Sequence, residues 1–465
     1  MIKELIDFRR ENSKTFDLGK GQRRLEAHIG AVHYKDNYED KSEQWKDIDL
    51  TFVDGRITRA PYTLEVRDLE ITVTSKKTGT VQTLALERIG SENSKLPVPW
   101  EFIGNLAVWR NAAPNTDVVI EAYPEGVNFK RILHSASAPL EAVFIYSKTV
   151  GKADDIAISV SARDADDELL EVARTDIAGK LTERLDSKVD LSKVKFPIVI
   201  DPDVTLQPPG KDTFLRENAP TTPQGGGTYV QVQTSTTNNR ARTVIGFDLS
   251  GQLPAGASII SAALSLYYYY FATDPVGRTY WCYRLTRNDW TEAGATWQQY
   301  KTGSAWTTAG GDWTTTAPAG SSIIMPSAYG WVNWDAKTLV EDAIANRGNL
   351  LDLLIKDASD YISTQYLSRF YSKEYATDLT LRPKLYIEYS VFPTQYPGLR
   401  AQIAGVMQEL CLVAAGDGAV GMGGIPKIAK GGIIRDIYLV ETSDPDASAI
   451  RIKTTTGIKA VREKT

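Results

Sequence analysis

Apolar and polar residues alternate in short runs between Gly30 and Asp203. Residues 48–52 alternate in this way and end at the dipeptide Asp54-Gly55, which is a strong hairpin signal between two such runs. Further runs with turn residues between them follow at 62–66, 69–74, 81–86 and 117–122. Short strands at this regular spacing predict a β-sandwich for the first part of the chain.

In the middle of the chain the alternation passes through a row of aromatic residues, LSLYYYYF at 264–271. If the two leucines face the core, Tyr268 and Tyr270 follow them, because strand side chains point to opposite faces in turn. The other face then carries three aromatic residues that could stack on sugar rings: Tyr267, Tyr269 and Phe271. The more common alternative is that a loop or a neighbouring subunit covers this face, since tyrosine is amphipathic and a good strand former.

Proline-rich segments mark the expected domain boundaries. The sequence PIVIDPDVTLQPPG, 197–210, predicts a strand followed by a linker, and FPTQYPG, 392–398, cannot continue a central strand. We expect an N-terminal arm (1–29), an N-terminal β-sandwich-like domain (30–207), a central domain (208–391) and a small β tail domain (392–465). In the central domain, Asp335 can cap one short helix, and we expect 205–391 to close its own core.

Composition and charge narrow the function classes. The apolar fraction of 42% is that of a globular protein, and the net charge of −5 comes from intermixed acids and bases. We therefore expect no nucleic-acid binding. No run approaches the roughly 20 apolar residues of a membrane span, and the charged start lacks a signal-peptide core. The cysteines, Cys282 and Cys411, are too far apart to suggest a disulfide framework.

The three histidines give little support to a catalytic site. His28 and His33 lie five residues apart on an apparent strand, hence on opposite faces, which does not suit two ligands of one metal ion. Neither these two residues nor His134 is near a nucleophile motif. No pair of carboxylates stands out for glycoside hydrolysis. We predict a non-enzymatic protein without a cofactor. Metal binding stays open, because the acidic run 164–168 could be a solvated turn or hold a calcium ion.

A family resemblance begins at DTFLREN, 212–218, which resembles the motif that names the DNRLRE domain, a type of carbohydrate-binding module. Further matches follow in the family's order: RTVIGFDLSGQLPAGASIISAALSLY (242–267), Asp289-Trp290-Thr291-Glu292, Thr296-Trp297, GWVNWDAKTLVEDAIANRGNLLDLLIK (330–356) and FYSKEYATDLTLRPKLYIEYS (370–390). The resemblance covers nearly all of 205–391. It implies a carbohydrate-binding jelly roll for the central domain. With the strand patterns of the flanking regions, we expect an all-β protein in which this jelly roll follows a first sandwich and precedes a small C-terminal β domain.

Seven of the ten tryptophans fall in this central domain, and indole offers a wide apolar surface to a sugar ring. Trp290, Trp297 and Trp331 match framework positions of the resemblance, so we expect them in the core. Trp306 and Trp313 lie in the Gly-, Thr- and Ala-rich loop 301–320 and are the better ligand candidates.

The flanking regions are similar to segments of other protein classes. FPIVIDPDVTLQ, 196–207, resembles a segment that precedes such modules in wall-associated and RHS-type repeat proteins, and residues 30–52 resemble the start of proteins from phage structural regions. The end of the chain, 421–465, resembles a short module on phage virion proteins. So small a sheet needs partners to cover its edges, and we expect oligomerisation or docking through Ile433, Ile437, Leu439, Ile458 and Val461.

Together these patterns favour a phage virion structural protein, either a fibre or a decoration subunit, with a carbohydrate-binding-like module on the outside. Its partners would be other virion proteins, further copies of itself and a polysaccharide. Two alternatives stay open: an extracellular or cell-wall carbohydrate-binding protein, and a polysaccharide depolymerase that uses the module for targeting.

Overall fold

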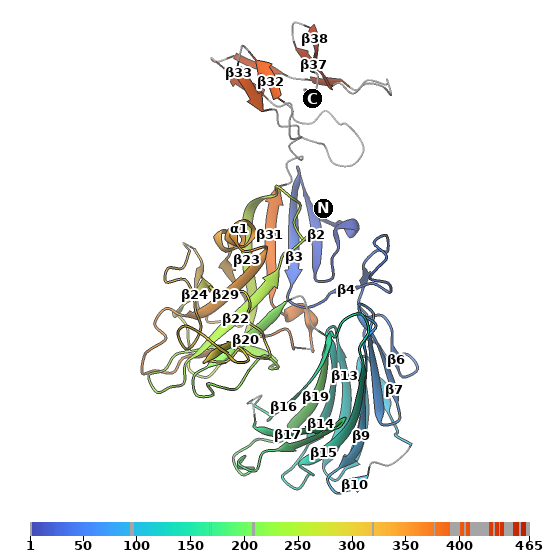
Figure 1. The fold of residues 1–465 in the computed structure, drawn as a ribbon. Coiled ribbons are helices and arrows are strands. Elements are labelled where there is room, and N and C mark those ends of the chain that lie inside the picture. The colour runs from blue at the N-terminus through green and yellow to red at the C-terminus, as the bar shows by residue number, and fades with distance from the viewer. Residues whose placement is uncertain are drawn as a thin grey trace.

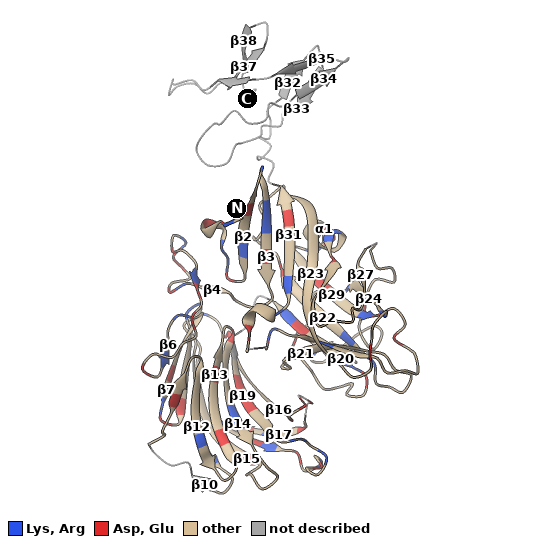
Figure 2. Ribbon diagram, turned by 180° about the vertical axis from the view of Figure 1, so that it is seen from behind, with Lys and Arg blue, Asp and Glu red and all other residues tan. Residues whose placement is uncertain are grey.

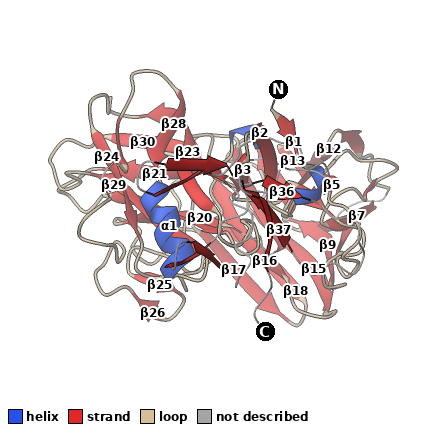
Figure 3. Ribbon diagram, turned by 90° about the horizontal axis from the view of Figure 1, so that it is seen from above, coloured by secondary structure: helices blue, strands red, loops and turns tan. Residues whose placement is uncertain are grey.

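The structure is a computed structural model that describes residues 2–93, 97–166, 168, 170–206, 210–318, 320–375 and 377–390, and the backbone of short strands between 400 and 461. Strands make up most of both folded units (Figures 1 and 3), and helix α1 (Lys337–Asn346) lies at the side of one of them. The prediction of an all-β protein built from sandwiches is confirmed.

Two antiparallel sheets face each other in the N-terminal unit, the lower one in Figure 1. Phe129 and Phe144 join them across the core with ring centroids 5.2 Å apart. At the predicted hairpin, Asp54 and Gly55 both have positive φ, which a type I′ turn requires. One sheet contains β6 (Arg56–Ile57), β7 (Tyr62–Arg67), β8 (Glu70–Ser75), β9 (Val81–Ile89), β10 (Glu92–Asn93), β15 (Glu141–Thr149), β17 (Val172–Ile177) and β18 (Lys180–Leu185); the other contains β11 (Glu101–Ile103), β12 (Leu106–Ala113), β13 (Thr116–Tyr123), β14 (Gly126–Leu133), β16 (Ile156–Arg163) and β19 (Ile198–Leu206).

The central unit is one long sheet that curls round its own core. Leu264 and Leu266 pack there with Ile245, Leu353 and Phe370. The neighbouring strands are, in order, β1 (Lys3–Glu4), β2 (Ser13–Gly19), β3 (Gln22–His28), β31 (Lys384–Ser390), β23 (Ser258–Phe271), β30 (Leu367–Tyr371), β21 (Tyr229–Gln233), β22 (Ala241–Asp248), β29 (Leu350–Asp357), β24 (Thr279–Arg284) and β27 (Ser322–Ile324), with β20 (Lys211–Arg216) on β22 and β28 (Gly330–Asp335) on β23.

Helix α1 closes one end of this core at the place where the sequence predicts a helix. It buries Leu339, Val340 and Ala343 against β23 and β29. The Asp335 carboxylate accepts a hydrogen bond of 2.9 Å from the backbone nitrogen of Lys337, so it satisfies one of the free N–H groups of the first turn. Asn349, with φ +68, follows the helix and turns the chain into β29.

The first 29 residues are part of the central unit. Strand β3 pairs with β31 along its whole length, from Gln22 opposite Ser390 to His28 opposite Lys384, and Leu25 lies in the same core as the central strands. Without β3, strand β31 would be an edge with unpaired backbone groups. Residues 205–391 therefore do not close this core alone.

The two units meet at a buried ion pair. Arg382 donates to Glu125 at 2.9 Å, and the other Glu125 oxygen accepts from the backbone nitrogen of Ala31 at 2.8 Å. A Cβ atom at Gly30 would come within 1.9 Å of this carboxylate, so a larger residue there would displace Glu125 from the ion pair. A second contact joins Glu168 to Arg369 of β30. The hairpin β4 (His33–Tyr34) and β5 (Lys46–Asp47) follows the first of these contacts along the chain.

Seven short strands are described in the tail as backbone only: β32 (Arg400–Ile403), β33 (Val406–Glu409), β34 (Lys427–Lys430), β35 (Ile433–Asp436), β36 (Tyr438–Val440), β37 (Ile450–Thr454) and β38 (Gly457–Val461). The last three form an antiparallel sheet. Of the predicted docking residues, Ile437 lies outside the described residues, and the side chains of Ile433, Leu439, Ile458 and Val461 are likewise not described.

Charged residues of both signs are mixed over the two folded units (Figure 2), as the composition predicts. Within the described part of the chain, none of the helices is long and apolar enough to cross a lipid bilayer.

Candidate functional site

The row of aromatic residues in β23 does not keep a strict alternation. Tyr268 is buried in the core, but the register with β30 shifts between Tyr268 and Tyr270. Beyond this bulge the faces exchange, so Tyr270 is 40% exposed and Phe271 packs against the core. The expectation that Phe271 joins the outer stripe is therefore wrong, because a bulge moves every later side chain to the opposite face.

Tyr267 and Tyr269 lie on the outer side of the sheet and form a cluster with three aromatic residues from other parts of the central unit. Tyr267 is 5.5 Å from Trp331 and 5.7 Å from Tyr371, measured between ring centroids. Tyr371 stacks on Tyr269 at 4.1 Å and on Tyr375 at 3.6 Å. We call these five residues the aromatic face. At its end Trp331 is 38% exposed, so its indole ring is open to a ligand.

Polar groups border the aromatic face. The ammonium nitrogen of Lys384 lies 5.0 Å from the ring centroid of Trp331. Beside them, the Ser265 hydroxyl donates a 2.5 Å hydrogen bond to the amide oxygen of the exposed Asn333. Pairing of β31, β23 and β28 places these three polar residues in one row across the sheet. An aromatic platform with hydrogen-bonding groups at its border can bind the apolar side of a sugar ring and its hydroxyl groups together.

A cleft of about 700 Å³ lies next to this row, between the central unit and loops of the N-terminal unit. Lys384, Glu26 and His28 line one wall, and Asp49 and Asn105 are among the residues opposite. Burial lowers the pKa of His28 below its usual value. For Glu26, burial acts to raise the pKa, but the hydrogen bond with His28 and the nearby Lys384 charge outweigh it and lower the pKa. The wall thus carries a neutral imidazole and an ionised carboxylate at neutral pH.

Trp306 and Trp313, expected in an open loop, lie against the other outer side of the sandwich. Trp306 is only 5% exposed, and its indole nitrogen donates a 2.8 Å hydrogen bond to the carbonyl of Thr296. Trp313 is half-buried beside Arg242. Both pack with Trp290 and Trp297 over the outward side chains of β20, β22 and β29. Trp306 is therefore closed to a large ligand, because the loop carries its own apolar core.

The structure exchanges the roles that the sequence motifs suggest for two tryptophans. Trp331, expected in the core, is the exposed member of the aromatic face, whereas Trp306 is buried. The alternation in GWVNWD could have indicated this, because Val332 and Trp334 point into the core and Trp331 must then point out. Tyr371, at the end of β30, and Tyr375, in the segment after it, join the face from about a hundred residues away in the chain, and no local pattern predicts that.

The histidines do not gather at one point. His28 contacts Glu26 at 3.0 Å, and His134 contacts Asp117 at 3.0 Å. His33 is buried with its Nδ1 atom 2.7 Å from the carbonyl of Arg10, and burial lowers its pKa to about 4. Among the described residues, the one group of potential metal ligands consists of Asp212, Glu292 and Glu374.

The acidic run 164–168 is arranged as a turn. The Asp164 carboxylate accepts hydrogen bonds from the backbone nitrogens of Asp166 and Glu168, both at 3.0 Å. Glu168 pairs with Arg369 and Arg216 of the central unit, and Asp167 lies outside the described residues. These contacts assign Glu168 to the junction between the units.

Three comparisons with known proteins bear on this site. Residues 203–389 match the model of carbohydrate-binding module family 96. No curated protein matches the chain. Among solved structures, the chain is similar to the N-terminal domain of the Streptococcus gordonii adhesin Sgo0707, with 6% identity, coverage of 82% of this chain and 91% of that chain, and a TM-score of 0.15, which is too low to indicate a common fold. The family match supports a carbohydrate-binding module in the central unit, and all five residues of the aromatic face lie within the matched segment.

Proposed function

We propose that the central unit binds a polysaccharide on its aromatic face, and that the whole chain is a virion structural protein, a fibre or decoration subunit, that uses this module to attach to surface glycans. The observation that carries the first part is the exposed Trp331 ring beside the stacked tyrosines. The resemblance of residues 30–52 and of the tail to phage structural proteins supports the second part.

Stacking explains why this face suits a sugar. The C–H groups on one side of a pyranose ring form an apolar surface, and Trp331 offers a flat ring of matching size. Lys384 and Asn333 lie at its edge and can donate hydrogen bonds to ring hydroxyls. The tyrosine stack behind Tyr267 fixes the platform before the ligand arrives, which lowers the entropy lost on binding.

Affinity electrophoresis of the full chain through gels that contain bacterial surface polysaccharides tests the binding function. We expect retardation by at least one glycan and a loss of affinity of about tenfold or more for Trp331→Ala, since losing a central aromatic contact often costs over about 1 kcal/mol. Tyr361→Ala is the matched control, because Tyr361 is 65% exposed and contacts Arg240 away from the aromatic face. Equal binding by the wild type and the Trp331 variant would refute the site.

Immunogold labelling of the C-terminal tail tests the virion function. We expect gold on purified phage particles. Label confined to the envelope of the producing cell would instead support an extracellular or cell-wall carbohydrate-binding protein. Release of reducing ends from a bound polysaccharide by the purified chain would support the depolymerase alternative.

A further inference from the structure

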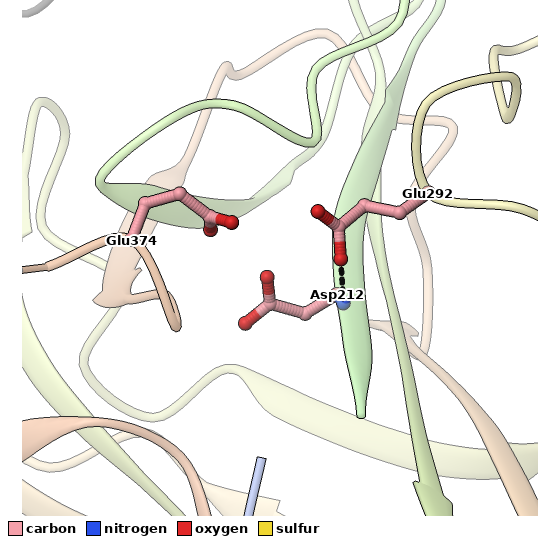
Figure 4. A group of neighbouring side chains, drawn as sticks. All are labelled: Asp212, Glu292 and Glu374. Carbon is pink, nitrogen blue, oxygen red and sulfur yellow. Dashed lines mark hydrogen bonds between the residues drawn. The ribbon is translucent and has the colours of Figure 1, made fainter. Parts of the chain in front are cut away.

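Three carboxylates from distant parts of the chain converge at one buried point of the central unit (Figure 4). Asp212 belongs to β20, Glu292 to the loop after β24, and Glu374 to the segment after β30. One oxygen from each lies within 4.8 Å of the others. Asp212 has no exposed surface. The fold therefore holds two partly exposed carboxylates, Glu292 and Glu374, beside a fully buried one.

Hydrogen bonds orient this cluster and leave two of its oxygens without a partner. The Lys373 backbone nitrogen donates to Asp212 Oδ2 at 3.0 Å, and the Asp212 backbone nitrogen donates to Glu292 Oε2 at 3.0 Å. The Lys373 ammonium group is 2.8 Å from Glu292 Oε1 and also pairs with Glu374 Oε1. Asp212 Oδ1 and Glu374 Oε2 are buried and accept no hydrogen bond. Each would be costly to bury without a further partner.

The charges of the cluster do not balance. Three carboxylates and the buried Lys373 ammonium group, which is 3% exposed, leave two negative charges. A cation at this point would neutralise the uncompensated charge and would also contact the two buried oxygens that accept no hydrogen bond.

We propose that Asp212, Glu292 and Glu374 bind one calcium ion. A divalent cation supplies the two missing positive charges and gives Asp212 Oδ1 and Glu374 Oε2 a partner. All ligand atoms are oxygens, which Ca²⁺ prefers, and its flexible coordination tolerates an irregular set completed by water, whereas Mg²⁺ demands a near-ideal octahedron. Lys373 keeps its place on Glu292, so the ion and the ammonium group share the carboxylates.

The ion would fasten the loop that covers one side of the sandwich. Glu292 follows Trp290 by two residues, and Trp290 lies 1% exposed in the apolar cluster of that loop. Asp212 belongs to strand β20 of the sheet, and Glu374 belongs to the segment that follows β30. Bound calcium thus links the loop to the sheet and adds to the ion pairs that the Lys373 ammonium group forms with Glu292 and Glu374.

Thermal melting of the full chain at pH 7.5 tests the proposal. After treatment with EDTA and dialysis, Ca²⁺ is added in steps and the melting temperature is recorded. Because an ion that binds only the folded chain stabilises it, we expect a rise of about 5 to 10 °C at a hundredfold excess over Kd. Elemental analysis of the dialysed, calcium-loaded chain should find one ion per chain.

Variants locate the ion. Glu374→Gln should fold, because it replaces a carboxylate by a neutral amide of similar size. It should lose most of the calcium-dependent rise in melting temperature. Glu292→Gln is the second variant if Glu374→Gln is unstable. Glu341→Gln is the matched control on the exposed side of α1, where it should leave the rise unchanged. A wild-type chain without bound calcium and without a change in melting temperature overturns the proposal and assigns protons to the cluster. A calcium effect that survives in both cluster variants overturns it too, because the ion then binds elsewhere.

Discussion

The two outer sides of the central sandwich both carry a cluster of aromatic residues, but they differ in the exposure of their tryptophans: Trp306 is 5% exposed and Trp331 is 38% exposed. On the covered side, Trp290, Trp297 and Trp306 lie under a long loop and pack on Val244 and Leu354 of the sheet. On the aromatic face, Trp331 is 38% exposed, and Ser265 and Lys384 belong to the row of polar residues beside it.

This difference follows the outward residues of the sheet. Val244 and Leu354 are apolar, and without the covering segment their side chains would meet water, at a cost of about 25 cal/mol per Å². Ser265 and Lys384 are polar and have partners of their own, the Asn333 amide oxygen and the Glu26 carboxylate, although little of either side chain is exposed. A tryptophan over apolar strand residues is therefore part of a core, whereas Trp331, on strand β28 beside polar residues, stays partly exposed.

Truncating one tryptophan on each side should give the largest contrast. Trp290→Ala removes a buried ring and leaves the Asp352 carboxylate without its 2.7 Å hydrogen bond, so we expect a loss of about 3–5 kcal/mol in the free energy of unfolding. Trp331→Ala should cost about 1 kcal/mol or less, as a partly exposed site. Chemical unfolding followed by fluorescence measures both. Similar losses at the two positions would show that the aromatic face is also core.

Leu25→Ala tests whether strand β3 contributes to the stability of the core beneath both outer sides. Leu25 is 1% exposed in the shared core, so its truncation should cost about 2–5 kcal/mol in the central unit. Ile2→Ala, at an exposed residue of the same N-terminal segment, is the control and should change little. Unchanged stability in the Leu25 variant would mean that β3 adds nothing to the core.

Trp306→Phe sharpens the comparison within the covered side. The change keeps an aromatic ring but removes the hydrogen bond to the Thr296 carbonyl, so we expect a loss of about 1–3 kcal/mol from the unpaired acceptor. Polysaccharide binding should stay at the wild-type level, because Trp306 is buried. Gel retardation and unfolding curves of the same preparation decide both points. Weaker polysaccharide binding with unchanged stability would contradict the assignment of Trp306 to the buried cluster.

The smallest effect should be a pH dependence next to the aromatic face. Burial lowers the pKa of His28 in the folded chain, so the histidine contributes stability that is present above its unfolded pKa of about 6.5 and is lost as the pH falls below it. His28→Gln should reduce the loss of stability between pH 7.5 and 5. His134→Gln, at an exposed histidine, provides the comparison. Equal pH profiles of stability for the wild type and His28→Gln would show that His28 does not cause the pH dependence.

Local patterns predicted much of the fold. The alternation before Asp54-Gly55, the helix after Asp335 and the strands of the central unit all appear in the structure, because each depends on neighbouring residues. The pairing of β3 with β31 joins residues more than three hundred positions apart and has no local signal. The bulge in β23 likewise has none, and it displaced Phe271 from the predicted stripe.

For the candidate site, the sequence identified the tyrosines of β23 and missed their partners. Tyr267 and Tyr269 follow from alternation alone, whereas Tyr371 and Tyr375 reach them through the pairing of β23 with β30. Trp306 was misassigned because a loop rich in Gly, Thr and Ala looks open, although its tryptophans close it. The carboxylates of Asp212, Glu292 and Glu374 come from segments up to 162 residues apart, and only the tertiary fold brings them together.

The position of β31 has a mechanical consequence. The chain leaves the central unit at Ser390, the last residue of this strand, and β31 is hydrogen-bonded on both sides, to β3 and to β23. A pulling force applied beyond Ser390 acts along the strand and loads both ladders in shear, so that many hydrogen bonds must break together. An edge strand peeled sideways would lose them one at a time. The pairing of β3 with β31 therefore predicts that the central unit resists unfolding by a force applied beyond Ser390.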